Sequence, residues 1–367
     1  MKGLYIHIPF CDKICNYCDF TKMVSTGDVK TKYIKRLKEE FEYRSNDLSN
    51  IDTIFIGGGT PNSLSIELLE EILVFIKDFT KKSKETTIEL NPDLLNIEQI
   101  MLFKKYGINR ISLGVESFND KLLKLLGRNH NKEMVYEKIK LLKDNGFDNI
   151  NIDLIFGIPG ETIDDVKYDL ECFKELDITH LSYYSLILED KTIFSYWLKN
   201  KKIELLDDDI VADMYDYINN FMSQNGYKHY EISNYAKPGY ESIHNKLYWT
   251  ESQYVGIGLG ASGFINNYRY NNQKIMKDYF NNTFEEKRDF ISIDEEKSEY
   301  LIFGLRKIDG ISISDYEKRY NTNLFDDFKI DKLIKKELLI IEGDYLKISP
   351  DKLFISILVF EELLNEG

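Results

Sequence analysis

The chain has 367 residues, of which 43% are hydrophobic, and carries a formal net charge of -14 at pH 7. This length allows one large domain with a sizeable core and a second, smaller domain. The acidic balance argues against binding to nucleic acid or to an anionic lipid surface, because both depend on Lys and Arg. No apolar run approaches the about 18 residues that span a bilayer, and the N-terminus lacks the features of a signal peptide. We therefore expect a cytoplasmic protein.

The first element in chain order is a β-rich apolar run, residues 3–8, which breaks at Pro9 and leads into a loop that carries three cysteines. Cys11, Cys15 and Cys18 follow a Cys-x3-Cys-x2-Cys spacing. Three thiolates on one short loop can hold three corners of a cubane iron–sulfur cluster. The fourth iron would then lack a protein ligand, and such an open iron can bind a small molecule.

These cysteines have two alternative uses, a zinc site and a disulfide. A structural zinc site normally needs four protein ligands, and His7 is the candidate for the fourth. However, His7 lies in an alternating strand, where a lone histidine is more often packed or on the surface. A disulfide would leave one of the three thiols over, and no secretion signal is present. An iron–sulfur cluster is therefore favoured, and Cys172, alone in a helical stretch, is interpreted as a buried apolar residue.

After the cysteine loop, predicted helices and β-rich runs alternate. Helices are expected over residues 29–45, 65–80, 95–105 and 131–145, with one more after residue 160, and strands over 51–59, 86–92, 109–118, 149–160 and 179–187. This alternation predicts βα units around a parallel sheet whose strands are nearly continuous apolar runs. Polar or glycine residues end each run, as expected if the carboxyl ends of the strands carry the site.

A glycine run, Gly57, Gly58 and Gly59, follows the second predicted strand and is succeeded by Thr60 and Pro61. It lacks the Lys and Ser or Thr of a Walker loop, and it is not a GxGxxG motif. Glycines allow a ligand to approach the backbone closely and leave main-chain groups free to bind it. Alone, such a turn is often purely structural.

Charged side chains lie on later strands that should be buried. Glu89, Glu116 and Asp153 are carboxylates in apolar segments, where an unpaired charge is costly. They act either as helix caps and ion-pair partners or as acceptors for ribose hydroxyls, as acidic residues do in dinucleotide sites. Arg128 is a cation that could bind a ligand carboxylate with two parallel hydrogen bonds. The alternative interpretation is that Arg128 is an exposed residue at a helix end.

The second half of the chain is of a different kind. A helix is expected over residues 207–224 and β-rich segments over 227–236 and 253–265, with His244 between them. From about residue 290, helices, two β-rich runs at 338–343 and 345–349, and a final helix predict a winged-helix-like module. This module is acidic, which is the wrong sign for contact with DNA phosphates, so a lid or docking surface is expected. The predicted domains are residues 1–190, 191–289 and 290–367.

Several short motifs together resemble one known family. YIHIPFC, CNYCDF, IGGGTPN, IELNP, ISLGVESFN, LGRNH and NIDLIFGIPGET are similar to the coproporphyrinogen III oxidase-like branch of the radical S-adenosylmethionine (SAM) proteins, over essentially the whole chain. The resemblance implies an α/β fold: a partial (β/α)6 radical SAM barrel with a small C-terminal winged-helix-like α+β domain. In this superfamily SAM chelates the open iron, and its reduction yields a 5'-deoxyadenosyl radical. The residues that the resemblance places against SAM are Tyr5, Tyr17, Gly58, Gly59, Thr60, Glu89, Glu116, Arg128, Asp153, Ile187 and Phe264.

This branch contains two groups of proteins, and two sequence features distinguish them. The oxygen-independent dehydrogenase HemN has a further cysteine two positions after its third cluster cysteine, where this chain has Phe20, and an N-terminal extension that is not seen ahead of Tyr5. HemW-like proteins carry an HNxxYW pattern associated with heme, which His244, Asn245, Tyr248 and Trp249 complete here. Imidazole is a standard axial ligand of heme iron, and Tyr and Trp can pack against a porphyrin.

The resemblance therefore implies a heme chaperone that passes heme to an acceptor protein and carries a three-cysteine 4Fe–4S cluster with exchangeable SAM. The alternative is a radical SAM coproporphyrinogen III dehydrogenase of porphyrin biosynthesis. Whether the chain is itself an enzyme stays open, because the parts that form the radical are present while Phe20 replaces the additional cysteine. The sequence also leaves open the identity of the acceptor, homodimer formation, and peripheral contact with a membrane through the acceptor.

Overall fold

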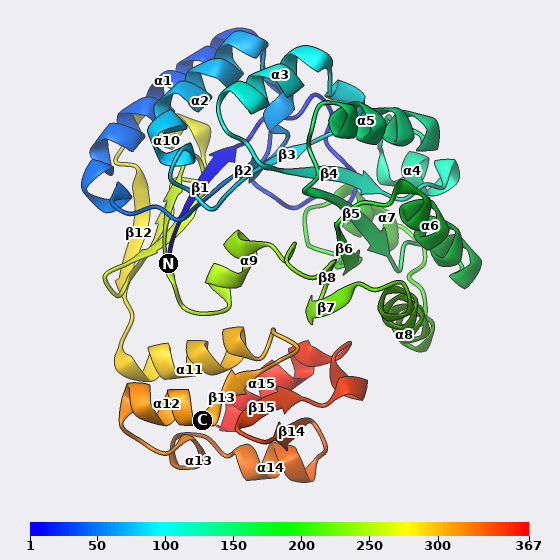
Figure 1. Cartoon of the computed structure of the whole chain (residues 1–367), viewed down its shortest axis with the longest axis vertical. Coiled ribbons are helices and arrows are strands. Elements are labelled where there is room, and N and C mark those ends of the chain that lie inside the picture. The colour runs from blue at the N-terminus through cyan, green and yellow to red at the C-terminus, as the bar shows by residue number, and fades with distance from the viewer. Residues whose placement is uncertain (367) are drawn as a thin grey trace.

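The computed structural model describes residues 1–366 and shows a curved α/β barrel above a smaller C-terminal domain (Figure 1). In this part of the chain the strands form a 12-stranded sheet and a 3-stranded sheet. Six consecutive strands of the large sheet pair in parallel in the order β1-β2-β3-β4-β5-β6. These are β1 (Lys2–Ile8), β2 (Thr53–Gly58), β3 (Glu85–Leu90), β4 (Arg110–Glu116), β5 (Ile150–Phe156) and β6 (His180–Ser185). The predicted partial (β/α)6 barrel is confirmed.

Helices cover the outer face of most of these strands. They are α1 (Gly27–Tyr43), α2 (Ile66–Thr80), α3 (Ile97–Lys105), α4 (Asp120–Leu126), α5 (Lys132–Asp144), α6 (Ile163–Leu176) and α8 (Asp208–Gln224). The short helix α7 (Ile193–Lys199) instead lies beyond the carboxyl ends of the strands. Side chains at Ser65, Asn96, Asn131 and Thr162 accept hydrogen bonds from backbone N–H groups and so begin four of them. The short helices α4 and α7 are not among the elements that the sequence predicted.

Further strands extend both edges of the barrel sheet. On one side, β9 (Gln253–Ile257) pairs in parallel with β1 and is followed by the antiparallel strands β10 (Ser262–Ile265), β11 (Tyr268–Asn272) and β12 (Glu285–Phe290). The short helix α10 (Met276–Asn281) connects β11 to β12. On the other side, β8 (Asn234–Ala236) pairs with β6, and β7 (Lys228–Glu231) forms the edge.

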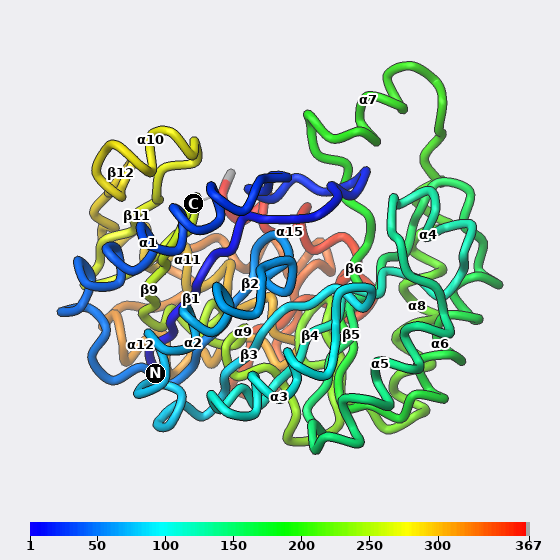
Figure 2. The backbone as a smooth tube through the Cα atoms, turned by 90° about the horizontal axis from the view of Figure 1, so that it is seen from above, coloured from blue at the N-terminus to red at the C-terminus, as the bar shows by residue number. Residues whose placement is uncertain are grey.

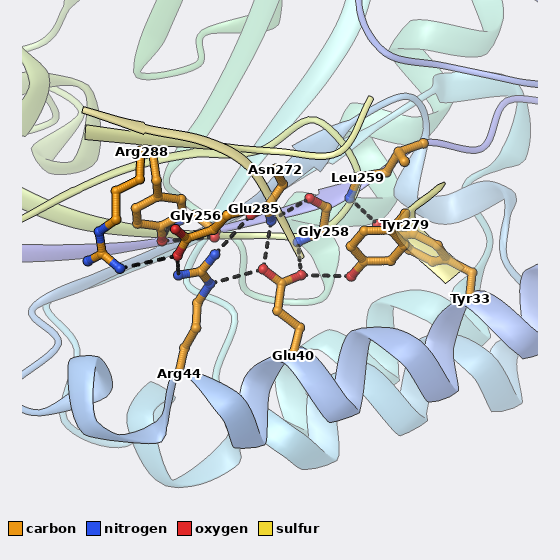
Figure 3. Close-up of polar contacts among 11 residues, drawn as sticks. Tyr33, Glu40, Arg44, Gly256, Gly258, Leu259, Asn272, Tyr279, Glu285 and Arg288 are labelled. Atoms are coloured by element: carbon orange, nitrogen blue, oxygen red, sulfur yellow. Dashed lines mark hydrogen bonds and ion pairs between the residues drawn. The ribbon is translucent and has the colours of Figure 1, made fainter. Parts of the chain in front are cut away.

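A buried ion pair fixes the β9–β12 extension to α1 (Figure 3). The Glu40 carboxylate accepts hydrogen bonds from Arg44 Nε at 3.0 Å, Gly258 N at 2.8 Å and the Tyr279 hydroxyl at 2.7 Å. Arg44 in turn donates to Asn272 Oδ1 at 2.9 Å. Both charged side chains are almost fully buried, with 0% of Glu40 and 1% of Arg44 exposed. The many hydrogen bonds compensate for the loss of water, as a buried pair requires.

The C-terminal domain lies below the barrel in Figure 1, with α11 nearest to it. It contains α11 (Ile293–Gly304), α12 (Ile313–Tyr320), α13 (Leu324–Asp327), α14 (Ile330–Lys335) and α15 (Ser356–Glu366). A small antiparallel sheet has the order β13-β15-β14, with β13 (Ile311–Ser312), β14 (Leu339–Glu342) and β15 (Tyr345–Ile348). Helices followed by a two-stranded hairpin agree with the predicted winged-helix-like order.

No helix within the described residues is long and apolar enough to cross a membrane.

Candidate functional site

The cysteine loop runs from the end of β1 across the carboxyl ends of the barrel strands, toward α4 and α7 (Figure 2). Backbone hydrogen bonds hold the loop at its base, between Cys11 and Met23, and at its middle, at Asn16. Cys11 N donates to Met23 O at 3.0 Å, Asn16 N donates to Leu126 O at 2.9 Å, and Phe194 N donates to Asn16 O at 2.9 Å. The loop thus covers one end of the barrel.

All three loop cysteines line one cavity of about 390 Å³ at this end of the barrel, which we term the cluster cavity. Its wall also includes Gly58, Gly59, Glu89, Glu116, Arg128, Asp153, Tyr17, Phe20 and Ile187. A volume of this size is within the about 300–1,000 Å³ of typical small-molecule sites. The cavity brings together most of the side chains that the sequence singled out.

The thiols have polar neighbours and are partly removed from water. Thr60 Oγ1 donates to Cys11 Sγ at 3.4 Å, and Arg128 donates to Cys15 Sγ at 3.4 Å. Burial raises the pKa of Cys11, and it raises the pKa of Cys18 to about 11. Bound metal would supply the positive charge that keeps such thiols deprotonated.

The zinc alternative finds no support in the position of His7. Its Nδ1 lies 2.9 Å from the Tyr5 hydroxyl and its Nε2 lies 2.7 Å from Thr21 O, so both ring nitrogens already have partners. Within residues 1–366, no three His, Cys, Asp or Glu side chains converge on a point suited to a single metal ion.

The glycine turn after β2 closely supports the cysteine loop. Gly59 N donates to Ile8 O at 2.8 Å, and a Cβ at Gly59 would lie 2.9 Å from Phe10 O and 3.0 Å from Cys11 Sγ. Gly58 has a φ of +116°, which side-chain-bearing residues rarely adopt. The turn thus needs glycine for its backbone geometry and for its contact with the first cluster cysteine.

The three predicted carboxylates lie on the neighbouring strands β3, β4 and β5 and line the cluster cavity. Burial raises the pKa of Glu89 to about 8 and that of Glu116 to about 7, and it also raises the pKa of Asp153. Asp153 accepts from Ser112 Oγ at 3.0 Å, and Glu89 accepts from Gly58 N at 3.0 Å. These acceptors face a ligand-sized cavity and are suited to hydroxyl and amine groups.

Arg128 is the buried cation of the cluster cavity. It donates to Asn91 Oδ1 at 3.0 Å and to Gly114 O, and its guanidinium lies 3.7 Å from the Glu116 carboxylate. Only 7% of the side chain is exposed, so Arg128 is not the exposed helix-end residue of the alternative interpretation. A fixed guanidinium beside Cys15 can hold a ligand carboxylate next to the cluster cysteines.

The HNxxYW segment lies at the opposite end of the barrel, on α9 (Ile243–Tyr248), between the strands and α11 in Figure 1. The Glu85 carboxylate accepts from Ile243 N and His244 N, each at 2.9 Å, and from Ser242 Oγ at 3.3 Å, so it caps the helix from the start of β3. This short helix closes the amino-terminal end of the barrel. Asn245 is half-buried on the same turn.

His244 is fully engaged inside the protein, with 1% of its surface exposed. Its Nδ1 lies 2.8 Å from Thr53 Oγ1 and its Nε2 lies 3.0 Å from the Tyr248 hydroxyl. Burial, together with the Arg110 charge, lowers the pKa of His244 to about 3. Both ring nitrogens thus have hydrogen-bond partners in the structure, and His244 as an axial ligand of heme iron stays a prediction.

A second cavity, of about 220 Å³, lies between the barrel and the C-terminal domain, and we term it the interdomain cavity. Its wall is formed by Tyr248, Trp249, Glu251, Ser252, Tyr254, Phe264, Arg269, Glu299 and Phe303. Two residues of the HNxxYW segment thus face α11 rather than the cysteine loop.

Two family models match the chain, one in the barrel and one in the C-terminal domain. The model of the radical SAM superfamily matches residues 5–173, and that of the HemN C-terminal domain matches residues 291–351. The heme chaperone HemW of Lactococcus lactis is 40% identical over 371 aligned positions, which cover 99% of this chain and 97% of that protein. The chain belongs to the HemW family of radical SAM proteins. HemW of Bacillus subtilis is 37% identical, with 88% of each chain covered.

The fold of this HemW family member is also that of a related enzyme. Escherichia coli coproporphyrinogen III oxidase, HemN, superposes with a TM-score of 0.83 at 22% identity, over 98% of this chain and 89% of the enzyme. The match includes both the barrel and the C-terminal domain, and at this identity it shows the fold alone.

Membership in the radical SAM superfamily implies a 4Fe–4S cluster and SAM. The cluster cavity fits both: it offers three thiols from one loop, a buried guanidinium, and buried carboxylates beside a glycine turn. Cys11, Cys15 and Cys18 would hold the cluster, which in this superfamily would supply an electron to SAM, and the other residues of the cavity would bind and orient SAM.

Most of the predicted SAM contacts of this HemW family member lie on the cluster cavity, but three do not line it. Tyr5 lies deeper in the barrel, bonded to His7, and Thr60 contacts Cys11 from behind. Phe264, on β10, lines the interdomain cavity instead. Ile187 lines the mouth of the cluster cavity and is 60% exposed.

Sequence reasoning missed several polar residues of the cluster cavity, of which two contact predicted site residues. Lys22 lines it and donates to Cys18 O, and Asn91 holds Arg128. Asn91 lies near the end of the strand predicted over residues 86–92, in IELNP, and that position was the available signal. Lys22 lies in a loop without periodicity, so no pattern identified it.

Proposed function

We propose that the chain is a heme chaperone that binds heme and transfers it to an acceptor protein, with a 4Fe–4S cluster and exchangeable SAM in the cluster cavity. The observation that carries the proposal is the similarity to heme chaperones over essentially the whole chain. The exposed Phe20 at the cavity wall supports it, since the related dehydrogenase is expected to have a cysteine there.

In this proposal each part of the cluster cavity has a role. Cys11, Cys15 and Cys18 hold the cluster. Arg128 orients the SAM carboxylate, and the main chain at Gly58 meets its amino group. The buried carboxylates accept hydrogen bonds from the remaining polar groups of SAM: Glu89, Glu116 and Asp153.

The direct experiment is a titration of the anaerobically reconstituted protein with ferric heme, followed by mixing with a heme-free acceptor protein. We expect one heme per chain and its passage to the acceptor. A protein that contains a full complement of iron and sulfide but takes up no heme would contradict the proposal.

A second candidate function is that of a radical SAM dehydrogenase acting on coproporphyrinogen III. The lining of the cluster cavity supports it, because three cysteines, a glycine turn and a buried guanidinium meet there. Reduced protein incubated with SAM and coproporphyrinogen III distinguishes the two: repeated formation of 5'-deoxyadenosine and protoporphyrinogen IX supports the enzyme, whereas heme binding without product supports the chaperone.

The remaining proposals concern the cellular compartment of the protein, its oligomeric state and its contact with a membrane. All four cysteines are unpaired, as in a reducing compartment, and we propose the cytoplasm. A homodimer and a peripheral membrane contact through the acceptor remain proposals, and size measurements with and without heme test the first of them.

A further inference from the structure

One charged side chain inside the barrel has no partner. Arg110 is the first residue of β4 and is only 2% exposed. Within residues 1–366 its guanidinium forms no hydrogen bond and no ion pair, and its Nε is buried without an acceptor. A buried charge without a partner is costly, and a guanidinium can only donate hydrogen bonds. Arg110 therefore requires an acceptor that the described residues do not provide.

The side chain of Arg110 lies on the face of β4 that points into the barrel. Ser112, two residues later on the same face, donates to the Asp153 carboxylate at 3.0 Å, and Asp153 lines the cluster cavity. Ile111 and Leu113, on the opposite face, belong to the hydrophobic core. Because side chains alternate along a strand, Arg110 lies about 7 Å deeper in the barrel than Ser112.

A second unpaired donor lies beside Arg110 on β3. Thr87 is 0% exposed, and its hydroxyl has no hydrogen bond within the described part of the chain. Thr87 and Arg110 are register partners in the parallel pair of β3 and β4, so their side chains lie next to each other on the same face of the sheet. Buried donors without a partner are rare in proteins, and two at one place indicate that a small acceptor binds between them.

The imidazole rings near Arg110 are already paired and neutral. His180 Nδ1 lies 2.6 Å from Asn151 Oδ1, and His180 Nε2 lies 2.8 Å from the Tyr230 hydroxyl. Both ring nitrogens of His244 are also bonded. Burial, together with the Arg110 charge, lowers the pKa of both histidines. These rings therefore add no charge, and they leave the donors of Arg110 to another molecule.

The donors select an anion as that molecule. The carboxyls nearest in charge are Glu89 and Asp153, whose pKa burial raises and the Arg110 charge lowers. Neither forms an ion pair with Arg110 in the described part of the chain, and both line the cluster cavity. A guanidinium repels a metal cation, but it binds planar oxyanions with two parallel hydrogen bonds. A carboxylate matches this fork of donors and the hydroxyl beside it.

We propose that the barrel interior contains a binding site for a small carboxylate anion, held by the Arg110 guanidinium on β4 and the Thr87 hydroxyl on β3. Thr87 lies on its strand between Glu89, which lines the cluster cavity, and Glu85, which caps α9. The site goes beyond the proposed function, because neither SAM nor heme is needed to fill it. Its carboxylate belongs to a free anion or to the end of a longer ligand that reaches in from the cluster cavity, and probes of two lengths distinguish these sources.

The test is a calorimetric titration of the anaerobically reconstituted protein with formate, in a buffer without other small anions. We expect one formate per chain in the wild type and no measurable binding in Arg110→Met. Thr87→Val should weaken binding about tenfold or more, because it removes a hydrogen bond to a charged group. The matched control is Thr86→Val, on the opposite face of the same strand, where the hydroxyl lies 2.7 Å from Ser83 Oγ. The control should bind formate as the wild type does.

Formate should also raise the unfolding temperature of the wild type but not that of Arg110→Met. Formate binding without hexanoate binding supports a free anion, whereas tighter binding of hexanoate supports a ligand that extends into the cluster cavity. Absence of binding of both anions to the folded wild type would overturn the proposal and leave water beside Arg110. Equal formate binding by the wild type and Arg110→Met would overturn it as well. If Arg110→Met does not fold, equal affinities of Thr87→Val and Thr86→Val overturn it instead. None of these results depends on heme binding, which is tested separately.

Discussion

Replacing Arg44 by Met tests how much the buried pair on α1 contributes to the fold. The substitution removes the cation from Glu40, which is 0% exposed, and leaves its carboxylate inside the protein. Removal of one partner of a buried ion pair costs about 3–5 kcal/mol, a large part of the about 5–15 kcal/mol that stabilises a typical native protein. Arg44 also stacks on Tyr270 at 3.9 Å, so the loss belongs in the upper half of that range.

The double variant Glu40→Gln/Arg44→Met measures the coupling. Without the carboxylate no charge is stranded, so the double variant is expected to be more stable than the sum of the two single variants, by about 1–3 kcal/mol. Urea unfolding followed by circular dichroism gives the free energies. Hydrogen exchange should show faster opening of residues 253–290, because Glu40 accepts from Gly258 N.

The matched control is Lys140→Met, which breaks an exposed pair with Asp144 at the same four-residue spacing on α5. It is expected to leave the urea midpoint unchanged, since exposed pairs contribute little. A loss below about 1 kcal/mol in Arg44→Met, or strict additivity in the double variant, would show that the buried pair does not hold the extension to α1.

Three further results are expected. Serine at any one of the three loop cysteines should abolish most iron binding on anaerobic reconstitution, whereas Cys172→Ser should retain it, because Cys172 is buried on α6 away from the loop. Gly59→Ala should lower cluster content, since its Cβ would lie within 3.0 Å of the cysteine loop, while Gly27→Ala, with no atom within 4 Å, should not. Burial raises the pKa of Glu161 from 4.5 to about 8. The protonated side chain therefore contributes stability that is fully present below pH 4.5 and is lost as the pH rises through 8. Because Glu161→Gln removes this titration, the free energy of unfolding of the variant should fall less between about pH 5 and 9 than that of the wild type.

The barrel was predictable because its signals are local. Each βα unit combines an apolar run with a capped amphipathic helix, and the cysteine spacing lies within eight positions of one loop. Carboxylates such as Glu89 could be placed at the site because the carboxyl ends of parallel strands share one edge of the sheet.

The features that escaped prediction depend on contacts between distant segments. Glu85 caps α9 across 158 positions of sequence, and Arg44 meets Asn272 across 228. The edge strand β12, EEKRDF, has no apolar alternation, because charged residues protect an exposed edge from further pairing. The position of His244 inside the barrel, rather than on a ligand surface, follows from Thr53 and Tyr248, and only the three-dimensional arrangement reveals it.

We propose that one chain holds a cluster with an open iron at one end of its barrel and binds heme at a separate site. An anaerobic EPR titration of the reconstituted protein, first with SAM and then with ferric heme, tests it most directly. We expect a 4Fe–4S signal that SAM perturbs, followed by the signal of one bound heme per chain while the cluster stays intact. Bound zinc without iron, or a cluster signal that neither addition changes, would contradict it.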